Sequence, residues 1–174
     1  MDFTTPVGQT ATRMERGAMY HHVLIATDGS ELAGKALEHG LSLARALGAR
    51  VTILTVTEDW NSATEGWGPL ELSFAEEQSG EQTAEEAYEQ AASEKAERIL
   101  TPAVAAAQEK GVEATSRHER DALPAPAILR TGDAVSCDLI VMGSHGRTGL
   151  NRFIMGSQAT EVMTKAAVPV LIVR

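Results

Sequence analysis

The sequence has a single cysteine, no long apolar run and no excess of basic residues. Cys137 cannot form an internal disulfide, and because an apolar run follows it, we expect a packed thiol in the core. No apolar run approaches the ~20 residues that a membrane-spanning helix needs. The first residues also lack the apolar segment of a secretory signal peptide. These absences predict a cytoplasmic protein without a membrane segment.

Basic residues are outnumbered, with 15 Lys and Arg against 24 Asp and Glu and a formal net charge of −9. Such a surface repels the phosphates of DNA and RNA, so we expect no nucleic-acid partner. It does not exclude one phosphate-bearing small molecule, because a local loop can be positive within an acidic protein. The histidines show no ligand spacing, so we expect no metal site formed by protein side chains alone.

Two regions differ in composition. Residues 1–19 are polar, contain Pro and Gly and show no periodicity, so we expect a flexible N-terminal extension. In residues 20–174, short apolar runs alternate with helical patterns, which predicts a single domain. No internal repeat indicates a second domain.

The alternation within residues 20–174 predicts the fold. Short apolar runs without strict alternation are typical of strands buried on both faces of a parallel sheet, and apolar residues at three- and four-residue spacing predict helices. We therefore expect an α/β fold: a doubly wound five-stranded parallel sheet, strand order 3-2-1-4-5, with helices on both faces. The expected strands are 22–27, 51–56, 112–117, 139–142 and 168–173, and the expected helices are 33–47, 82–111, 124–135 and 156–166.

Some local details leave alternatives open. The segment 57–80 is long for a connection, so we expect an irregular lid, partner surface or mobile segment, in which Trp60 and Trp67 pack locally rather than against a ligand. Pro102 should either kink the helix 82–111 or split it, with Thr101 as a new cap. Either Ser30 or Asp28 should cap the first helix.

Distinctive residues follow the first and the fourth strand. The first strand ends in Ala26-Thr27-Asp28, and the fourth in Met142-Gly143-Ser144-His145-Gly146. In an open parallel sheet, ligands bind outside the carboxyl ends of the strands, where the strand order reverses. If these two strands are neighbours, Asp28 faces the glycine loop across that crevice.

The glycine loop and the helix after it suit a nucleotide phosphate. Gly143 and Gly146 would permit a tight turn and a close approach of phosphate to the backbone, although glycines here are as often plain turn residues. Gly156 and Ser157 open a helix whose free N–H groups favour an anion. Asp28 would instead suit ribose hydroxyls. The spacing Gly143-x2-Gly146-x9-Gly156-Ser157 fits neither GxGxxG nor the P-loop, which requires a lysine.

These stretches resemble the universal stress protein family over residues 20–174. The resemblance rests on His22–Ser30, Leu139–Ser157 and Val168–Val173. The glycine spacing resembles the ATP-binding branch, which implies bound ATP, with Mg²⁺ or Mn²⁺ held through its phosphates, and a homodimer joined through the final strand, 168–173. The nucleotide-binding residues that it implies are Ala26, Thr27, Asp28, Val56, Met142, Gly143, Gly146, Gly156 and Ser157. From their places in the glycine loop and at the helix start, we add Ser144, His145, Arg147, which could supply charge, and Gln158, whose backbone N–H should still serve.

The chain also departs from the family pattern. Gln158 stands where a small apolar residue is common, and its bulk could alter the phosphate end of the site. The segment 57–80 and the N-terminal extension are longer than the family minimum.

We expect an ATP-binding regulatory or stress-response protein that acts as a nucleotide-dependent homodimer. A slow ATP hydrolase or phosphotransferase using the same pocket is the alternative, and a dimerisation module with a vestigial pocket is a third possibility. Phosphoryl transfer needs groups that position a metal ion, and no acidic residue lies near the glycine loop in the sequence. We therefore assign no catalytic residue and expect turnover to be absent or slow.

Overall fold

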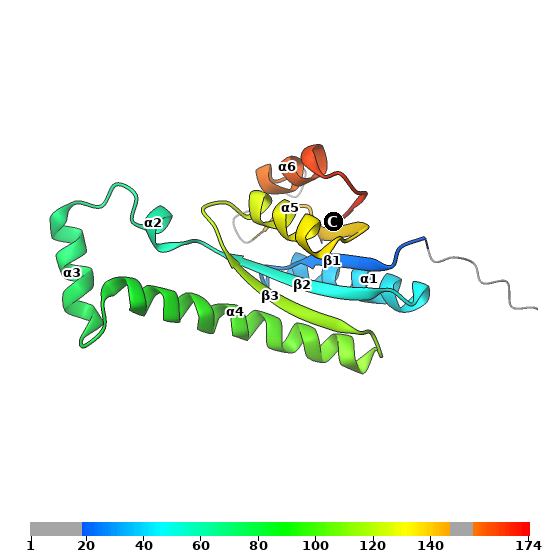
Figure 1. Ribbon diagram of the computed structural model, residues 1–174, viewed down its shortest axis with the longest axis horizontal. Coiled ribbons are helices and arrows are strands. Elements are labelled where there is room, and N and C mark those ends of the chain that lie inside the picture. Colours follow the sequence, from blue (N-terminus) through cyan, green and yellow to red (C-terminus); the bar gives the residue numbers. More distant parts are fainter. Residues whose placement is uncertain (1–18, 147–154) are drawn as a thin grey trace, which may run out of the picture.

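The sheet contains five parallel strands in the order β3-β2-β1-β4-β5. The computed structural model describes residues 19–146 and 155–174, so the predicted extension lies outside the described residues except for Met19. The predicted α/β class, parallel sheet and strand order are confirmed (Figure 1). The strands are β1 His22–Ala26, β2 Arg50–Thr57, β3 Ala114–Arg120, β4 Leu139–Gly143 and β5 Val170–Val173.

Neighbouring strands β1 and β4 form the centre of the sheet. Every residue of both strands is buried, as expected for apolar strands covered on two faces. They pair in parallel with Val23 opposite Leu139 and Ile25 opposite Val141. Their carboxyl ends therefore meet at one edge, and this pairing places Asp28 and the glycine loop together, as the sequence predicts.

Two pairs of helices cover the two faces of the sheet (Figure 1). Helices α1 (Glu31–Leu47) and α4 (Ala84–Glu109) bury their alanine- and leucine-rich stripes against one face. Helices α5 (Pro124–Val135) and α6 (Ser157–Lys165) cover the other face. The start of each helix after β1 and β4 consequently lies at the carboxyl edge of the sheet, where the candidate site is expected.

Of the two predicted candidates, Ser30 and Asp28, Ser30 caps α1. Its hydroxyl accepts a hydrogen bond from the Ala33 N–H at 3.2 Å, and Asp28 instead accepts from the Ser30 N–H at 3.0 Å. Gly48 ends α1 in the left-handed conformation, with φ +68°, which glycine adopts without a steric cost. Both ends of α1 are thus fixed by local contacts.

The prediction for residues 57–80 is wrong, and of the two alternatives for Pro102 the structure excludes the split helix. Residues 57–80 are not irregular: they contain the helices α2 (Trp60–Ala63) and α3 (Pro69–Ser79). The Asp59 side chain caps α2 through the Ser62 N–H at 3.0 Å, a local signal that the sequence reading missed. Helix α4 is not split at Thr101, because alanines and Leu100 on both sides of Pro102 are buried against the sheet.

The predicted core thiol is confirmed. Cys137 is buried, and burial raises the pKa of its thiol to about 11, so it stays protonated at neutral pH. Within residues 19–146 and 155–174, no helix is both long and apolar enough to span a membrane.

Candidate functional site

A cavity of about 390 Å³ opens at the carboxyl ends of β1, β2 and β4. Its size lies within the range of small-molecule pockets, and its position is the one expected for ligands in this topology. It brings together eleven of the thirteen predicted site residues: Ala26, Thr27, Asp28, Val56, Met142, Gly143, His145, Gly146, Gly156, Ser157 and Gln158.

The other two predicted residues are not part of this lining. Ser144 is buried, its N–H donates to the Val173 carbonyl at 2.8 Å, and its hydroxyl lies 3.0 Å from Nδ1 of His145. Ser144 therefore extends the pairing of β4 with β5 and contacts His145 rather than the cavity. Arg147 lies outside the described residues.

The turn after β1 presents Asp28 to the cavity. The Thr27 N–H donates to the Leu54 carbonyl at 2.8 Å, which prolongs the β1–β2 pairing to the rim. Gly29 then turns the chain with φ +77°. Oδ1 of Asp28 is engaged with the Ser30 N–H, so the conformation of the carboxylate is fixed by the same turn that starts α1.

Gly146 lies directly against Asp28. A Cβ atom at residue 146 would sit 2.8 Å from Oδ2 of Asp28, too close for any side chain without a shift. Neither Gly143 nor Gly146 has a positive φ. The chain therefore passes both glycines without the left-handed conformation, and Gly146 packs closely against the Asp28 carboxylate.

Gly156 joins the two ends of the loop that follows β4. Its N–H donates to the Ser144 carbonyl at 2.8 Å, and a Cβ atom here would lie 3.3 Å from that same carbonyl oxygen. The chain thus leaves the sheet at residue 145 and returns at the same point. Helix α6 begins immediately afterwards, at the wall of the cavity.

The N-terminus of α6 lacks a side-chain cap. Its N-cap is Gly156, which has no side chain that could accept from the N–H groups of the first turn. Uncapped N–H groups and the positive end of the helix dipole favour an anion. Ser157 at the first helical position adds a hydroxyl donor in the cavity lining.

Gln158 links the two helices that cover this face of the sheet. Its side-chain oxygen accepts a hydrogen bond from the Ala125 N–H at 2.8 Å. Helix α5 has no side-chain cap of its own, since its N-cap is Leu123. The Gln158 amide, on α6, therefore caps α5. Gln158, which stands where the family commonly has a small apolar residue, thus has a structural role in addition to lining the cavity.

The remaining cavity wall is mostly apolar. Met142, Val56 and Leu54 form it from the strands, and Pro124 and Ile128 from α5. The sequence reading did not include Leu54, Pro124, Ile128, Ala33 or Ala159. The rule that ligands bind at the carboxyl edge of the strands could have indicated the start of α5, because the chain returns to that edge after β3.

The charged groups of the cavity are few. Asp28 is the one carboxylate in the described lining, and no lysine or arginine belongs to it. Among the described residues, no group of three or more His, Cys, Asp or Glu side chains could hold a metal ion. An apolar wall, one carboxylate and an uncapped helix N-terminus suit a ligand with a flat apolar part, hydroxyl groups and an anionic end.

The family profile described as "Universal stress protein family" matches residues 19–174. The chain belongs to the universal stress protein family. Universal stress protein YxiE of Bacillus subtilis is 32% identical over 159 residues, covering 90% of this chain and 100% of that protein. Universal stress protein MJ0531 of Methanocaldococcus jannaschii is 30% identical over 156 residues, covering 90% and 83% respectively.

Solved structures of the family share the fold. Protein MJ0577, from the same archaeon, has a TM-score of 0.70 at 26% identity, covering 89% of this chain and 96% of that one. A universal stress protein solved with cAMP has a TM-score of 0.59 at 22% identity, covering 89% and 97%. One from Archaeoglobus fulgidus solved with dAMP has a TM-score of 0.58 at 21% identity, covering 89% and 98%. At 22% and 21% identity, the similarity to these two structures establishes the fold alone.

Proposed function

We propose that this universal stress protein binds ATP in the cavity at the carboxyl ends of β1 and β4. In this proposal it acts in the cytoplasm as a homodimeric stress-response regulator whose surface depends on the bound nucleotide. The adenine would lie against Met142 and Val56, the ribose hydroxyls would donate to Asp28, and the phosphates would meet the start of α6. Mg²⁺ or Mn²⁺ would be held through the phosphates.

The uncapped N-terminus of α6 is the observation that carries the proposal. It opens at Gly156 into the same cavity that Asp28 lines. An anion-binding helix end, a hydroxyl acceptor and an apolar wall in one cavity match the chemistry of a nucleotide. The cAMP and dAMP complexes of proteins with this fold are consistent with an adenine nucleotide, but the argument rests on the residues of this chain.

Replacing Ser157 with Asp tests where the phosphates bind. An Asp at the first helical position is favourable to the helix dipole, so α6 should remain folded, but its charge would repel a phosphate. We expect the affinity for ATP to fall about tenfold or more, equivalent to ~1.4 kcal/mol, while the affinity for adenosine stays the same. Isothermal titration calorimetry would measure both ligands.

Ser157→Ala is the matched control, since it removes the hydroxyl without adding charge and should have a smaller effect. An equal loss of ATP and adenosine binding would mean that the substitution changed the cavity as a whole. Unchanged ATP binding by Ser157→Asp would contradict the phosphate site at α6, and no binding of ATP by the native protein would contradict the proposed function itself.

The structure gives no specific support to the alternative of ATP hydrolysis. Asp28 is the one carboxylate in the described cavity lining, and one of its oxygens is engaged with the Ser30 N–H. A metal ion that activates phosphoryl transfer normally has dedicated protein ligands. Steady release of phosphate over many turnovers, lost in His145→Ala, would favour the alternative.

A further inference from the structure

Residues 58–94 form an extension that we call the acidic arm. It consists of α2, α3 and the first turns of α4, and α3 with the start of α4 projects beyond the end of the sheet (Figure 1). The arm contains no Lys or Arg. It contains eleven carboxylates: Glu58, Asp59, Glu65, Glu71, Glu76, Glu77, Glu81, Glu85, Glu86, Glu89 and Glu94.

The arm also exposes several apolar side chains, of which Leu70 and Phe74, four residues apart, lie on one face of α3. Trp67 is 44% exposed, Leu70 64%, Leu72 39% and Phe74 52%, and α3 buries no residue. Single exposed apolar residues are ordinary on protein surfaces, but a contiguous group marks an interaction site. Beside this group runs a groove lined by Trp67 and Phe74 and, from α4, by Ala84 and Ala87.

Local contacts hold the arm in its conformation. The ring of Trp60 lies edge-on to Trp67 and Tyr88, with centroids 6.1 and 5.6 Å away. The Glu76 carboxylate accepts a hydrogen bond from the Ala84 N–H at 3.3 Å, which joins α3 to the start of α4. The groove is therefore preformed by contacts that leave the apolar side chains of α3 uncovered.

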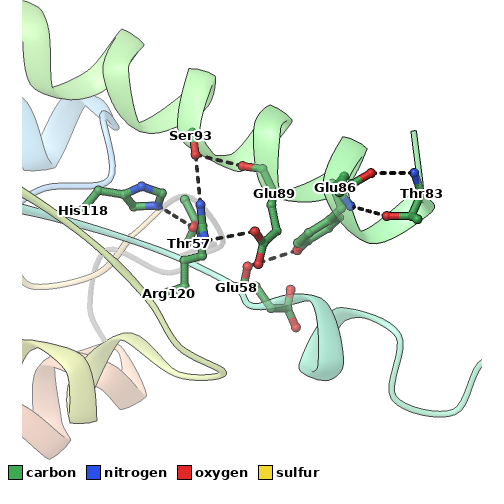
Figure 2. Close-up of polar contacts among 9 residues, drawn as sticks. Thr57, Glu58, Thr83, Glu86, Glu89, Ser93, His118 and Arg120 are labelled. Atoms are coloured by element: carbon green, nitrogen blue, oxygen red, sulfur yellow. Dashed lines mark hydrogen bonds and ion pairs between the residues drawn. The ribbon is translucent and has the colours of Figure 1, made fainter. Parts of the chain in front are cut away.

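The base of the arm is fixed to the sheet (Figure 2). Arg120 at the end of β3 lies 3.3 Å from Glu89 and donates to the Ser93 hydroxyl at 3.1 Å. Two residues before Arg120, His118 of β3 is hydrogen-bonded to Thr57 of β2 at 2.7 Å. The Arg120 contacts attach α4 to β3, and the bond between Thr57 and His118 joins β3 to β2, so the base of the arm is tied to the sheet.

Most of the negative charge on the arm has no cationic partner. In the part of the chain that the structure describes, Glu89 and Glu94 are the arm carboxylates that pair with an arginine. A second copy of the arm, a nucleic acid or an anionic membrane would add negative charge to negative charge. A basic protein surface would neutralise it, and the exposed apolar group requires that this surface also have an apolar face.

We propose that the acidic arm is a docking surface for a basic amphipathic helix of a partner protein. The apolar face of that helix lies on Trp67, Leu70 and Phe74, as in other complexes in which a helix occupies a groove. Its lysines and arginines face the carboxylates of α3 and of the first turns of α4. This proposal concerns a surface separate from the nucleotide cavity and does not depend on the proposed function.

The two tryptophans of the chain, Trp60 and Trp67, both belong to the arm, so selectively excited tryptophan fluorescence reports on this surface alone. The probe is a synthetic amphipathic Leu/Lys peptide of about 18 residues, long enough to form a helix, titrated into the full chain without nucleotide. We expect a saturable change of tryptophan emission that weakens as salt is raised. A Leu/Glu peptide of the same pattern should not produce it.

Two pairs of substitutions test the two components of the surface. Leu70→Ala with Phe74→Ala should weaken peptide binding about tenfold or more, as expected for central apolar contacts. Glu77→Gln with Glu85→Gln, which removes one exposed charge from α3 and one from α4, should weaken it and reduce its salt dependence. Met163→Ala, a similarly exposed apolar residue on α6 (48%), is the matched control and should leave binding unchanged.

Several results would overturn the proposal. They are the absence of saturable binding, equal binding of the Leu/Glu peptide, and an equal loss in Met163→Ala. Conversion of a dimer to a monomer by Leu70→Ala with Phe74→Ala, seen by analytical ultracentrifugation, would also overturn it, because the surface would then be an interface between copies. Circular dichroism verifies that each variant is folded, and the two charge substitutions remain decisive if the apolar pair disturbs α3.

Discussion

Gly146 and Asp28 show how one contact can account for a motif residue without a ligand. A Cβ atom at residue 146 would lie 2.8 Å from Oδ2 of Asp28 and require that carboxylate to shift, so glycine keeps the carboxylate in place whether or not a phosphate approaches. The carboxylate is in turn oriented by the Ser30 N–H. The glycine at residue 146 is therefore explained by packing at the rim of the cavity. Ligand binding is better tested by a substitution of Asp28 itself.

Asp28→Asn should separate the ribose contact from the turn. Asn keeps an oxygen that can accept from the Ser30 N–H but loses the negative charge. Because hydrogen bonds to charged groups contribute ~1.5–3 kcal/mol, we expect ATP affinity to fall about tenfold or more. The affinity for 2′,3′-dideoxy-ATP, which lacks the hydroxyls, should not change in calorimetric titrations. An equal loss for both nucleotides would show that Asp28 acts only through the local structure.

The buried His22 should make the protein less stable in mild acid. Burial, aided by the charge of Arg50, lowers the pKa of His22; Nδ1 donates to the Val135 carbonyl, and Nε2 lies 2.8 Å from the Thr52 hydroxyl. The unfolded state, with a histidine pKa of about 6.5, then binds more protons below that pH. The free energy of unfolding should therefore fall as pH drops below about 6.5 and stay unaffected by His22 above it.

Urea denaturation at one pH above about 6.5 and at one pH below it measures the change in the free energy of unfolding. His22→Gln should lose less stability on acidification than the native protein. The exposed His39→Gln on α1 is the control and should behave like the native protein. Part of the loss should persist in His22→Gln, because burial also lowers the pKa of His118. An unchanged pH dependence in His22→Gln would contradict the assignment.

At the scale of the element, α1 contains two glycines with opposite expected effects. A Cβ atom at Gly40 would lie 2.6 Å from Cδ1 of Ile25 in β1, whereas nothing lies within 4 Å of one at Gly34. Gly40→Ala should destabilise the protein by about 1–3 kcal/mol through overpacking. Gly34→Ala should stabilise it by up to about 1 kcal/mol, because alanine favours the helix.

Chemical denaturation of the two variants measures both values, and each variant is the control for the other. If both substitutions stabilise the protein, the end of the Ile25 side chain can move aside at little cost. If both destabilise it, helix propensity does not dominate at Gly34.

The elements that the sequence predicts well are those that carry their own signals. The apolar runs of β1 and β4 and the spacing of alanines and leucines in α1 are enough to place them, because burial on the sheet and local periodicity agree. Two short signals, Asp59 before α2 and Pro69 at the start of α3, were present but lay among glycines and tryptophans. Neither helix buries a residue, so no apolar stripe marked them.

Contacts between distant elements could not be predicted from the sequence. The burial of Ser144 depends on β5, and the cap that Gln158 provides for Ala125 joins two helices. Similarly, the continuity of α4 through Pro102 depends on how Leu100 and Ala103 pack on the sheet. Local patterns contain the residues of the cavity but not these pairings, which the tertiary structure decides.

At the scale of the whole molecule, the two edges of the sheet differ in chemistry. Edge strand β3 contains Arg117, His118, Glu119 and Arg120, and charged residues discourage pairing with another sheet. Edge strand β5 consists of four apolar residues, Val170–Val173, and Leu171 is 38% exposed. This asymmetry supports the proposed homodimer through β5, while the acidic arm projects from the base formed by β2, β3 and α4.

Leu171→Lys should weaken that dimer. A two-fold interface repeats the same strand on both sides, so the substitution places two positive charges close together and removes exposed apolar surface from the contact. Sedimentation velocity of the native protein and the variant over a range of concentrations should show a shift toward monomer. Ser116→Lys on β3 is the matched control and should leave the association unchanged. A native protein that remains monomeric would contradict the dimer, and an equal shift in both variants would show that added charge, not the β5 edge, governs association.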